Sequence, residues 1–473
     1  MAVSDTLAEY FEFEEHGTDL RTELLAGLTT FLAMSYIVVV NPGILAKTDV
    51  NFAQDGMQPA ISPTGYSPGE VFQMVAIVTI ISAMVATAVM AVYANRPFGQ
   101  APGLGLNAFF AFTVVGAMGI SWQTALAAVV VEGLLFIVLT LVGARSYVIE
   151  LFPEPVKVAV GTGIGLFLAL IGFTEMNVVV PGSGTVVTLG SVAQDPVALL
   201  SLAGLFFTLM LYARRIPGSI VIGIIATTLA AYGLEAANVV ARGTLTPGDI
   251  PSATYDISPL AGAFVGGLQE VEAAAFALVI FTFFFVDFFD TAGTLTGVGQ
   301  AANLLDEEGN LPEMEKPLLA DGIGTTVGGA LGTSTVTTYI ESATGVEEGG
   351  RTGMTALTVA GLFLLSLAFV PLAAAVPLYA SHIALVVVGV IMLRNVGDIL
   401  WDDLTYAIPA GMTILVMPFT YNIGYGIAAG IISYPLVKAG AGELEDTHPA
   451  HWLLAAAFVV YFYVRTSGLL TAI

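Results

Sequence analysis

The chain contains no cysteine, which excludes both a disulfide framework and a thiol-ligated metal site. Charged residues are scarce as well: they make up 11% of the 473 residues, whereas a soluble domain carries about 25%. Hydrophobic residues, by contrast, account for 56% of the chain. This balance is that of an integral membrane protein, so we expect the chain to be embedded in a lipid bilayer.

Basic residues are the scarcest of the charged residues. The chain has 13 lysine and arginine residues against 37 aspartate and glutamate residues, and its formal net charge is −24. Nucleic-acid binding is excluded because phosphate contacts require a basic face. The acidic residues gather in EFEEHGTD, LDEEGNLPEMEK and GELEDTHP, which we interpret as a solvated acidic surface suited to a salty cytoplasm. We expect no cleavable signal peptide, because the N-terminal sequence lacks a basic n-region.

Long apolar runs dominate the chain, and a membrane-spanning helix needs about 20 such residues. With glycine, proline and charge taken as breaks, the pattern predicts an all-α polytopic membrane protein with fourteen transmembrane segments. These segments are 23–45, 71–93, 103–119, 123–143, 157–174, 195–213, 216–235, 271–293, 317–332, 335–345, 352–377, 380–397, 403–419 and 421–438. A further apolar segment, 450–467, can either span the membrane or lie along its interface.

Basic residues set the expected orientation, because cytoplasmic loops carry an excess of lysine and arginine. When the N-terminus is placed in the cytoplasm, Lys47 and Arg242 fall in outer loops. The basic residues that then fall on the cytoplasmic side are Arg21, Arg96, Arg145, Lys157, Arg214, Arg215, Lys316, Arg351, Arg394 and Lys438. We therefore expect a multi-pass protein of the cell membrane with a cytoplasmic N-terminus.

Two of the expected segments do not follow an ordinary helical pattern. The third, APGLGLNAFFAF (101–112), begins with a proline and two glycines, and the tenth, LGTSTVTTYIES (331–342), contains a β-branched, strand-like run. Interrupted segments in corresponding halves of a chain mark the binding site of many transporters. The offset of seven segments predicts two seven-span repeats of inverted topology, 23–236 and 271–438. The other parts are an acidic N-terminus (1–22), an outer loop (237–270) and an acidic linker with the extra apolar segment (439–473).

Carboxylates are the costliest of the few polar residues at membrane depth. The run AAAFALVIFTFF leads into FVDFFDTAGT, which places Asp287 and Asp290 three residues apart on one helix face. A charge at the bilayer centre costs about 2.5–3.5 kcal/mol, so we expect these side chains to have a function. Asn107 and Glu341 lie in the two interrupted segments. The structural alternative is that these polar residues only cap helices or tie helices together.

The chemistry of these residues points to a ligand with N–H groups. No basic residue lies within the spans that carry them, and burial without a cationic partner favours the protonated form of a carboxyl group. We therefore expect at least one of Asp287, Asp290 and Glu341 to exchange a proton. Carboxylates and an amide suit a planar heterocycle with donors and acceptors on its edge, and half-helix N-termini add backbone N–H groups.

Four sequence blocks carry a family resemblance. They are ELLAGLTTFLAMSYIVVVNP (23–42), APGLGLNAFFAF (101–112), FVDFFDTAGTLTGV (285–298) and LGTSTVTTYIESATGVEEGGRTG (331–353). These blocks resemble the hypoxanthine/adenine/guanine permeases, the AzgA-type branch of the xanthine–uracil permease (nucleobase–ascorbate transporter) superfamily, and the likeness extends from about residue 17 to 438. The resemblance implies fourteen spans in a seven-plus-seven inverted repeat, core and gate domains, and two short strands near the membrane midplane.

The same resemblance implies proton-coupled uptake of purine nucleobases, commonly by a homodimer, and it assigns roles to residues. The expected substrate-binding residues are Asn107, Asp287 and Glu341, with backbone contacts from Thr338 and Tyr339. The expected proton-coupling residues are Asp287, Asp290 and Glu341. The aromatic side chains that we expect to wall the purine are Phe109, Phe285 and Phe288.

The sequence departs from the family pattern in ATGVEEGGRTG, where Glu347 and Glu348 replace small residues; we assign both to the acidic cytoplasmic surface. A salty cytoplasm leaves sodium open as the coupling ion in place of a proton. Anion channels and exchangers share this architecture, but acidic site residues argue against an anionic substrate. DFFD also has the DxxD pattern of a magnesium-dependent prenyltransferase, but no second acidic motif accompanies it. We therefore expect a transporter without enzymatic activity, cofactor or metal site.

Overall fold

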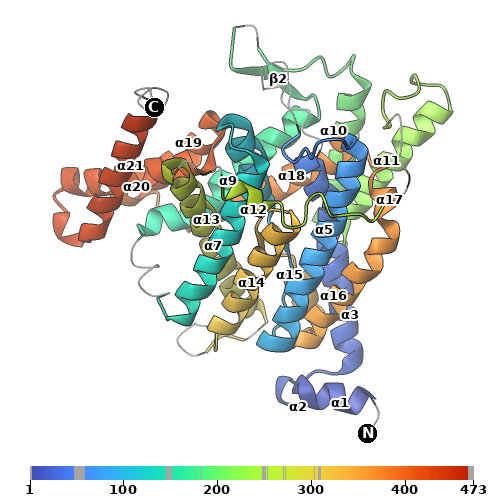
Figure 1. Cartoon of the computed structure of the whole chain (residues 1–473), viewed down its shortest axis with the longest axis horizontal. Helices are drawn as coiled ribbons and strands as arrows, with labels where there is room; N and C mark the ends of the chain where they lie inside the picture. Colours follow the sequence, from blue (N-terminus) through green and yellow to red (C-terminus); the bar gives the residue numbers. More distant parts are fainter. Residues whose placement is uncertain are drawn as a thin grey trace. The chain divides into compact units, whose positions relative to one another are not determined.

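A computed structural model shows a predominantly helical chain (Figure 1). The structure describes residues 3–46, 59–144, 152–182, 184–247, 252, 254–269, 271, 273–302, 304–306 and 311–466. Of the residues used above to predict orientation, Lys47 and Arg145 lie outside this part of the chain. The fold divides into two compact units: unit 1 comprises Met1–Leu141 and Leu170–Val387, and unit 2 comprises Val142–Ala169 and Val388–Ile473.

Unit 1 contains most of the helices. Its described helices are α1 (Val3–Tyr10), α2 (Phe13–His16), α3 (Leu20–Met34), α4 (Ile37–Ala46), α5 (Pro68–Val89), α6 (Leu104–Ala108), α7 (Trp122–Leu141), α10 (Pro196–Ala213), α11 (Ser219–Ala236), α12 (Phe264–Gly267), α13 (Ala273–Ala301), α14 (Glu315–Leu331), α15 (Ser342–Glu347), α16 (Gly353–Ser366) and α17 (Val370–Ala373). Helices α9 (Glu154–Glu175) and α18 (Leu378–Met392) have residues in both units. Wider π-helical turns continue α5 over Met90–Ala94 (η1) and α6 over Phe109–Ala117 (η2).

The start of α5 shows how the local sequence sets a helix boundary. The sequence SPGE places Pro68 in the first turn, where its missing N–H costs nothing. The Ser67 hydroxyl accepts a hydrogen bond from Glu70 N at 3.3 Å, and the Glu70 carboxylate accepts one from Ser67 N at 2.8 Å. This reciprocal capping box satisfies donors that the first helical turn would otherwise leave free.

Helices that are distant in the sequence lie side by side in unit 1. Helix α7 packs against α14, and α16 packs against α3 and α5 (Figure 1). A Cβ atom at Gly133 of α7 would lie 2.6 Å from Thr326 Oγ1 and 2.7 Å from Thr326 N of α14. Glycine at this position therefore allows α7 and α14 to approach each other closely.

The two interrupted segments meet as a pair of short strands. Strand β1 (Gln100–Pro102) pairs antiparallel with β4 (Val336–Thr338), with Ala101 opposite Thr337. Each strand leads into a short helix: β1 into α6 through Gly103, and β4 into α15. The predicted membrane fold with short strands in the third and tenth segments is thereby confirmed. The strands are buried throughout, so protein satisfies their extended backbone, as membrane depth requires.

A second strand pair was not expected. Strand β2 (Val179–Pro181) pairs antiparallel with β3 (Val187–Leu189). The sequence VVVPGSGTVVTL explains it, because β-branched runs flank a proline- and glycine-rich turn.

Helix α13 differs from its predicted extent. We expected a segment ending at residue 293, with the aspartates near its end, but the helix continues to Ala301. Asp287 and Asp290 therefore lie in the middle of a long helix, which rules out the structural alternative that Asp290 only caps a helix end.

Unit 2 is built around the end of the chain. It contains α19 (Leu404–Thr420), α20 (Ile423–Ala441), α21 (Pro449–Thr466), the 3-10 turns η4 (Leu393–Asp398) and η5 (Leu444–Asp446), and most of α9. One part of its core is formed by the buried side chains Ala159, Ile399, Ala410 and Ile414.

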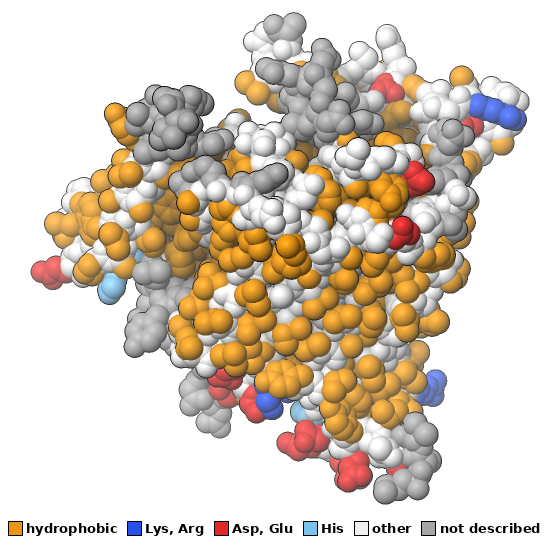
Figure 2. Space-filling model, viewed as in Figure 1, with side chains coloured by type: hydrophobic (Ala, Val, Ile, Leu, Met, Phe, Trp, Pro, Cys, Tyr) orange, Lys and Arg blue, Asp and Glu red, His pale blue; other side chains and the backbone are white. Residues whose placement is uncertain are grey.

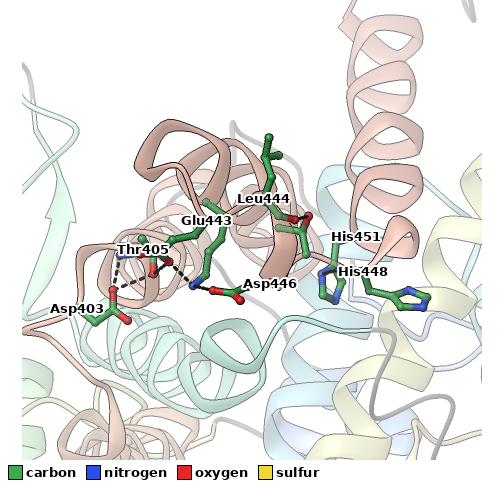
Figure 3. A network of polar contacts seen from close by, with 9 residues as sticks. Asp403, Thr405, Glu443, Leu444, Asp446, His448 and His451 are labelled. Atoms are coloured by element: carbon green, nitrogen blue, oxygen red, sulfur yellow. Dashed lines mark hydrogen bonds and ion pairs between the residues drawn. The ribbon is translucent and has the colours of Figure 1, made fainter.

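The extra apolar segment forms α21, which packs along α20. Tyr425 makes an edge-to-face contact with Phe462, and Tyr434 makes one with His451, so the two helices run antiparallel. The turn between them is held by a polar network (Figure 3), in which Lys438 Nζ lies 2.6 Å from Glu443 Oε2. The 18 residues of α21 correspond to a length of about 27 Å, comparable to that of a membrane span.

Apolar side chains cover the middle of the helices on the face of the molecule shown in Figure 2, and most of the charged side chains visible there lie near helix ends. Within the described residues, nine helices are long and apolar enough to cross a membrane. This arrangement is that of a multi-pass membrane protein. The count of fourteen segments stays a prediction.

Candidate functional site

The strand pair β1–β4 lies in unit 1 at the centre of a group of polar side chains. Helices α13 and α14 both contact β4, and α13 also contacts α6 and α15. The mid-helix part of α13, the two strands and the short helices that follow them therefore supply all of the side chains that we predicted as substrate-binding or proton-coupling.

Asp287 of α13 is completely buried and poorly hydrogen-bonded. Thr325 of α14 donates a hydrogen bond to Asp287 Oδ2 at 3.4 Å, which is long for this type of bond. Among the described residues, none donates a hydrogen bond to Asp287 Oδ1. A buried carboxylate oxygen without a donor is costly, so this oxygen is available to a proton or to an N–H group.

Asp321 of α14 was not among the predicted site residues. It is completely buried, and its Oδ1 atom accepts hydrogen bonds from Gln100 Nε2 at 3.0 Å, Thr291 Oγ1 at 2.9 Å and Thr338 Oγ1 at 3.0 Å. Its second oxygen, Oδ2, has no donor in the described part of the chain. Asp321 thus holds α13, β1 and β4 together through one of its two carboxylate oxygens.

Glu132 of α7 is a second residue that was missed. It is completely buried, and neither of its carboxylate oxygens receives a hydrogen bond from the described residues. Its carboxyl group lies within interaction distance of Asp287 and Asp321. The signal was present in TALAAVVVEGLLFIVLT (124–140), where a single acid interrupts an apolar run, and the argument applied to Asp287 applies equally here.

Asp290 and Glu341 form a less buried pair. Both side chains are partly exposed, and the two carboxyl groups are close enough to interact. Tyr36, at the break between α3 and α4, donates a hydrogen bond to Glu341 Oε1 at 2.5 Å. Glu341 occupies the N-cap position of α15 but its side chain makes no capping hydrogen bond, so the helix-cap alternative is wrong. The carboxyl groups of Asp290 and Glu341 are thus more exposed than those of Glu132, Asp287 and Asp321.

The surface next to this pair is open. Ile340, between Tyr339 and Glu341, is 56% exposed. Gly293, on the same helix as Asp290 and three residues further along, is exposed, and no atom of the other described segments lies within 4 Å of the position where its Cβ would be.

Asn107 and the strand residues hold the interrupted segments together. Ser334 Oγ donates a hydrogen bond to Asn107 Oδ1, and Asn107 Nδ2 donates one to Pro102 O at 3.5 Å. The Tyr339 hydroxyl also donates to Pro102 O, at 2.6 Å, and Tyr339 N donates to Gly99 O at 3.0 Å. Asn107 and Tyr339 therefore both have partners within the protein.

The predicted aromatic wall is buried. Phe285 is fully buried, and Phe109 and Phe288 are 1% and 3% exposed. Phe109 packs edge-to-face on Phe283, and Phe288 lies 5.7 Å from the ring centroid of Phe136 in α7. These rings pack against other aromatic rings around Asp287, and a role as a substrate wall stays a prediction.

Glu347 and Glu348 are exposed, as expected for an acidic surface. Within the described residues, no group of three or more histidine, aspartate and glutamate side chains has an arrangement that could hold a metal ion. We call the carboxyl groups of Glu132, Asp287 and Asp321 the buried acid cluster, because all three side chains are completely buried.

Comparison with known protein sequences finds a family profile and several relatives that match nearly the whole chain. The sequence profile of the Permease family (Xan_ur_permease) matches residues 21–429. The adenine permease AdeQ of Escherichia coli is 38% identical over 460 residues, which cover 97% of this chain and 96% of AdeQ. The guanine/hypoxanthine permease PbuO of Bacillus subtilis is 39% identical over 459 residues, which cover 96% of this chain and 99% of PbuO.

A solved structure shares the fold. The transmembrane domain of a cyanobacterium bicarbonate transporter, BicA, matches with a TM-score of 0.56 at 17% identity, covering 87% of this chain and 97% of that domain. At this identity the likeness shows the fold alone.

Proposed function

This chain belongs to the Xan_ur_permease family of permeases, and we propose that it imports purine nucleobases such as hypoxanthine, adenine and guanine by cation symport. Its relatives named above are an adenine permease and a guanine/hypoxanthine permease, each aligned over nearly the whole chain. The observation that carries the proposal is the partly exposed pair Asp290 and Glu341 beside a buried acid cluster. This arrangement suits a neutral ring with N–H donors.

In this proposal the purine lies against the partly exposed pair. Glu341 accepts an N–H group of the ring, and the Tyr36 hydroxyl orients the carboxylate from the other side. Asp287 Oδ1, the free oxygen behind the pair, accepts a second donor or a proton. Asn107 and the backbone of Thr338 and Tyr339 shape the site by keeping the strand pair in place.

We infer that the coupling ion is a proton. Carboxyl groups that lack cationic partners bind protons readily, whereas a sodium site needs several oxygen ligands directed at one point. Import by alternating access between core and gate domains, a homodimeric assembly and a cytoplasmic N-terminus in the cell membrane belong to the same proposal. The fold shared with a bicarbonate transporter does not favour an anionic substrate here, because the site contains carboxylic acids and no lysine or arginine among the described residues named above.

Uptake of radiolabelled adenine and hypoxanthine into proteoliposomes tests the proposal. A hydrogen bond to a charged group is worth about 1.5–3 kcal/mol, so Asp287→Asn and Glu341→Gln should each reduce uptake by about 10- to 150-fold. Asp256→Asn is the matched control, because Asp256 is a loop residue whose carboxylate accepts a local hydrogen bond from Ser258 N at 2.9 Å. Wild-type uptake by both site variants would refute the site.

Two further measurements define substrate and coupling. Unlabelled purines should compete with adenine uptake, and pyrimidines or bicarbonate should not; competition by bicarbonate alone would contradict purine transport.

Collapse of the proton gradient with a protonophore should abolish accumulation in sodium-free buffer. Accumulation that survives the protonophore and requires sodium would assign the coupling to sodium.

A further inference from the structure

Glu132 is a buried acid that the substrate site described above does not use. It lies in the middle of α7, where the neighbouring Gly133 brings this helix close to Thr326 of α14. The side chain is completely buried, and neither carboxylate oxygen accepts a hydrogen bond from any residue that the structure describes. An ionised carboxylate in this environment would lose its hydration without compensation.

The groups that face Glu132 are also acidic. They come from α13 and α14, which both pack against α7: Asp287 is in contact with it and Asp321 lies nearby, with Asp290 beyond them. The spans 122–141 and 273–301 contain no lysine, arginine or histidine, and the only basic residue of α14, Lys316, forms an ion pair with Glu313 at 2.7 Å. No cation among these elements balances three adjacent carboxylates.

Hydrogen-bond donors distinguish the three acids. Asp321 Oδ1 accepts three hydrogen bonds, which stabilise the ionised form of this group. Glu132 has none from the described residues, although the fully buried Thr335 faces it and its hydroxyl has no other partner among them. Two carboxyl groups in contact can form a hydrogen bond only if one carries the proton. Glu132 is the member of the cluster for which the described residues provide the fewest hydrogen bonds, so it is the one that gains most from holding a proton.

We propose that Glu132 is a proton-binding residue of the transport cycle, which donates its proton to Asp287 across the buried acid cluster. The O–H bond of Glu132 breaks, a bond forms between that proton and Asp287 Oδ1, and the negative charge moves from Asp287 to Glu132. The proton comes from solvent and returns to it, so no other reactant is required. This inference rests on the proposed proton symport and deepens it by naming where the coupling proton is held.

The first test detects the proton itself. The infrared spectrum of the purified protein should contain the C=O stretching band of a protonated, non-exposed carboxyl group, and Glu132→Gln should remove it. Glu23→Gln is the matched control, because Glu23 is equally buried but accepts hydrogen bonds from backbone N–H groups. An unchanged band in Glu132→Gln, or its loss in the control, would overturn the proposal.

The second test separates coupling from binding. Proteoliposomes containing Glu132→Gln should exchange labelled for unlabelled adenine like wild type, but should lose accumulation driven by a proton gradient. Glu132→Asp, which keeps a carboxyl group, should restore part of the accumulation. Accumulation by Glu132→Gln at the wild-type level would refute the proposal, and so would loss of exchange in both variants, since that is the result of a purely structural role.

These two tests distinguish failure of this inference from failure of the proposed function. If the wild-type protein neither binds nor exchanges adenine, purine transport is wrong, while the infrared band still decides whether Glu132 carries a proton. If adenine exchange is normal and the band does not depend on Glu132, purine transport stands and the role of Glu132 is wrong.

Discussion

Two buried glutamates in unit 1, Glu23 and Glu132, have opposite surroundings. Glu23 of α3 is completely buried beside the start of α16, where its carboxylate accepts hydrogen bonds from Arg351 N at 2.9 Å, Thr355 N at 3.0 Å and Thr355 Oγ1 at 2.6 Å. Glu132 of α7 is just as buried, and no described residue donates a hydrogen bond to it.

The difference shows that burial of an acid does not by itself indicate function. The N-terminus of α16 presents N–H groups that have no partner within the helix, and those of Arg351 and Thr355 donate to the Glu23 side chain, which joins α3 to α16. Glu132 instead faces Thr335 and the two acids Asp287 and Asp321, with no unpaired cation among the described residues of α7, α13 and α14. A bound proton would remove the negative charge of its carboxylate. The hydrogen-bond donors around a buried acid therefore indicate whether it is structural or functional.

Replacing each of these two glutamates by glutamine should give the largest effect, a clear difference in stability between the two variants. Glu23→Gln places an NH₂ group against backbone N–H donors and leaves them unsatisfied, so we expect a loss of about 1–3 kcal/mol in the free energy of unfolding. Glu132→Gln replaces a group without donors by a neutral one of the same shape and should leave stability unchanged or raise it. Thermal unfolding in detergent measures both; equal destabilisation would remove the distinction.

Tyr36→Phe tests whether a hydrogen-bond donor also matters at the partly exposed pair Asp290 and Glu341. We expect its effect to be of intermediate size. It removes the 2.5 Å hydrogen bond to Glu341 and leaves the carboxylate in place. A hydrogen bond of this kind contributes about 0.5–1.5 kcal/mol, so the apparent affinity for adenine should fall by about 2- to 12-fold. Tyr232→Phe is the control, because the Tyr232 hydroxyl donates to Ala375 O at 3.1 Å, away from the acids. Equal effects of the two variants would show that Tyr36 acts through packing.

Asp19 provides a solvent-exposed counterpart to Glu23, with the smallest expected effect. Its side chain caps α3 by accepting a hydrogen bond from Thr22 N at 2.9 Å, and that backbone N–H lowers the pKa of the Asp19 carboxyl group. Because the pKa is lower in the folded state, the stabilisation is present above the ordinary pKa of 3.8 and is lost as the pH falls through the folded value.

Asp19→Asn retains a capping side chain but removes the charge. Its melting temperature should lie slightly below that of wild type near neutral pH, and the difference should disappear in acid. A difference that is constant with pH would show that the charge of Asp19 contributes nothing.

Several features of the site were predictable from the sequence because their physical signal is local. An acid in an apolar run is costly wherever the helix packs, which is why Asp287 and Asp290 stand out. Proline and glycine at 102–105 and the β-branched run at 333–338 cannot continue an ordinary helix, and both regions do contain the strands β1 and β4. Glu132 was not predicted, although a single acid in an apolar run is the same local signal.

The chain alone, through its apolar runs, its scarcity of cations and its isolated acids, determined that this is a membrane protein with carboxylic acids inside its apolar helices. Those properties follow from the cost of moving each residue out of water, which depends on residue type and near neighbours in sequence. Tertiary structure alone decided which groups surround each acid. It brings Glu23 to the N-terminus of α16, brings Glu132, Asp287 and Asp321 together from three helices, and leaves Asp290 and Glu341 partly exposed. Hydrogen-bond satisfaction depends on groups that are hundreds of residues apart in the chain, and only folding brings them into contact.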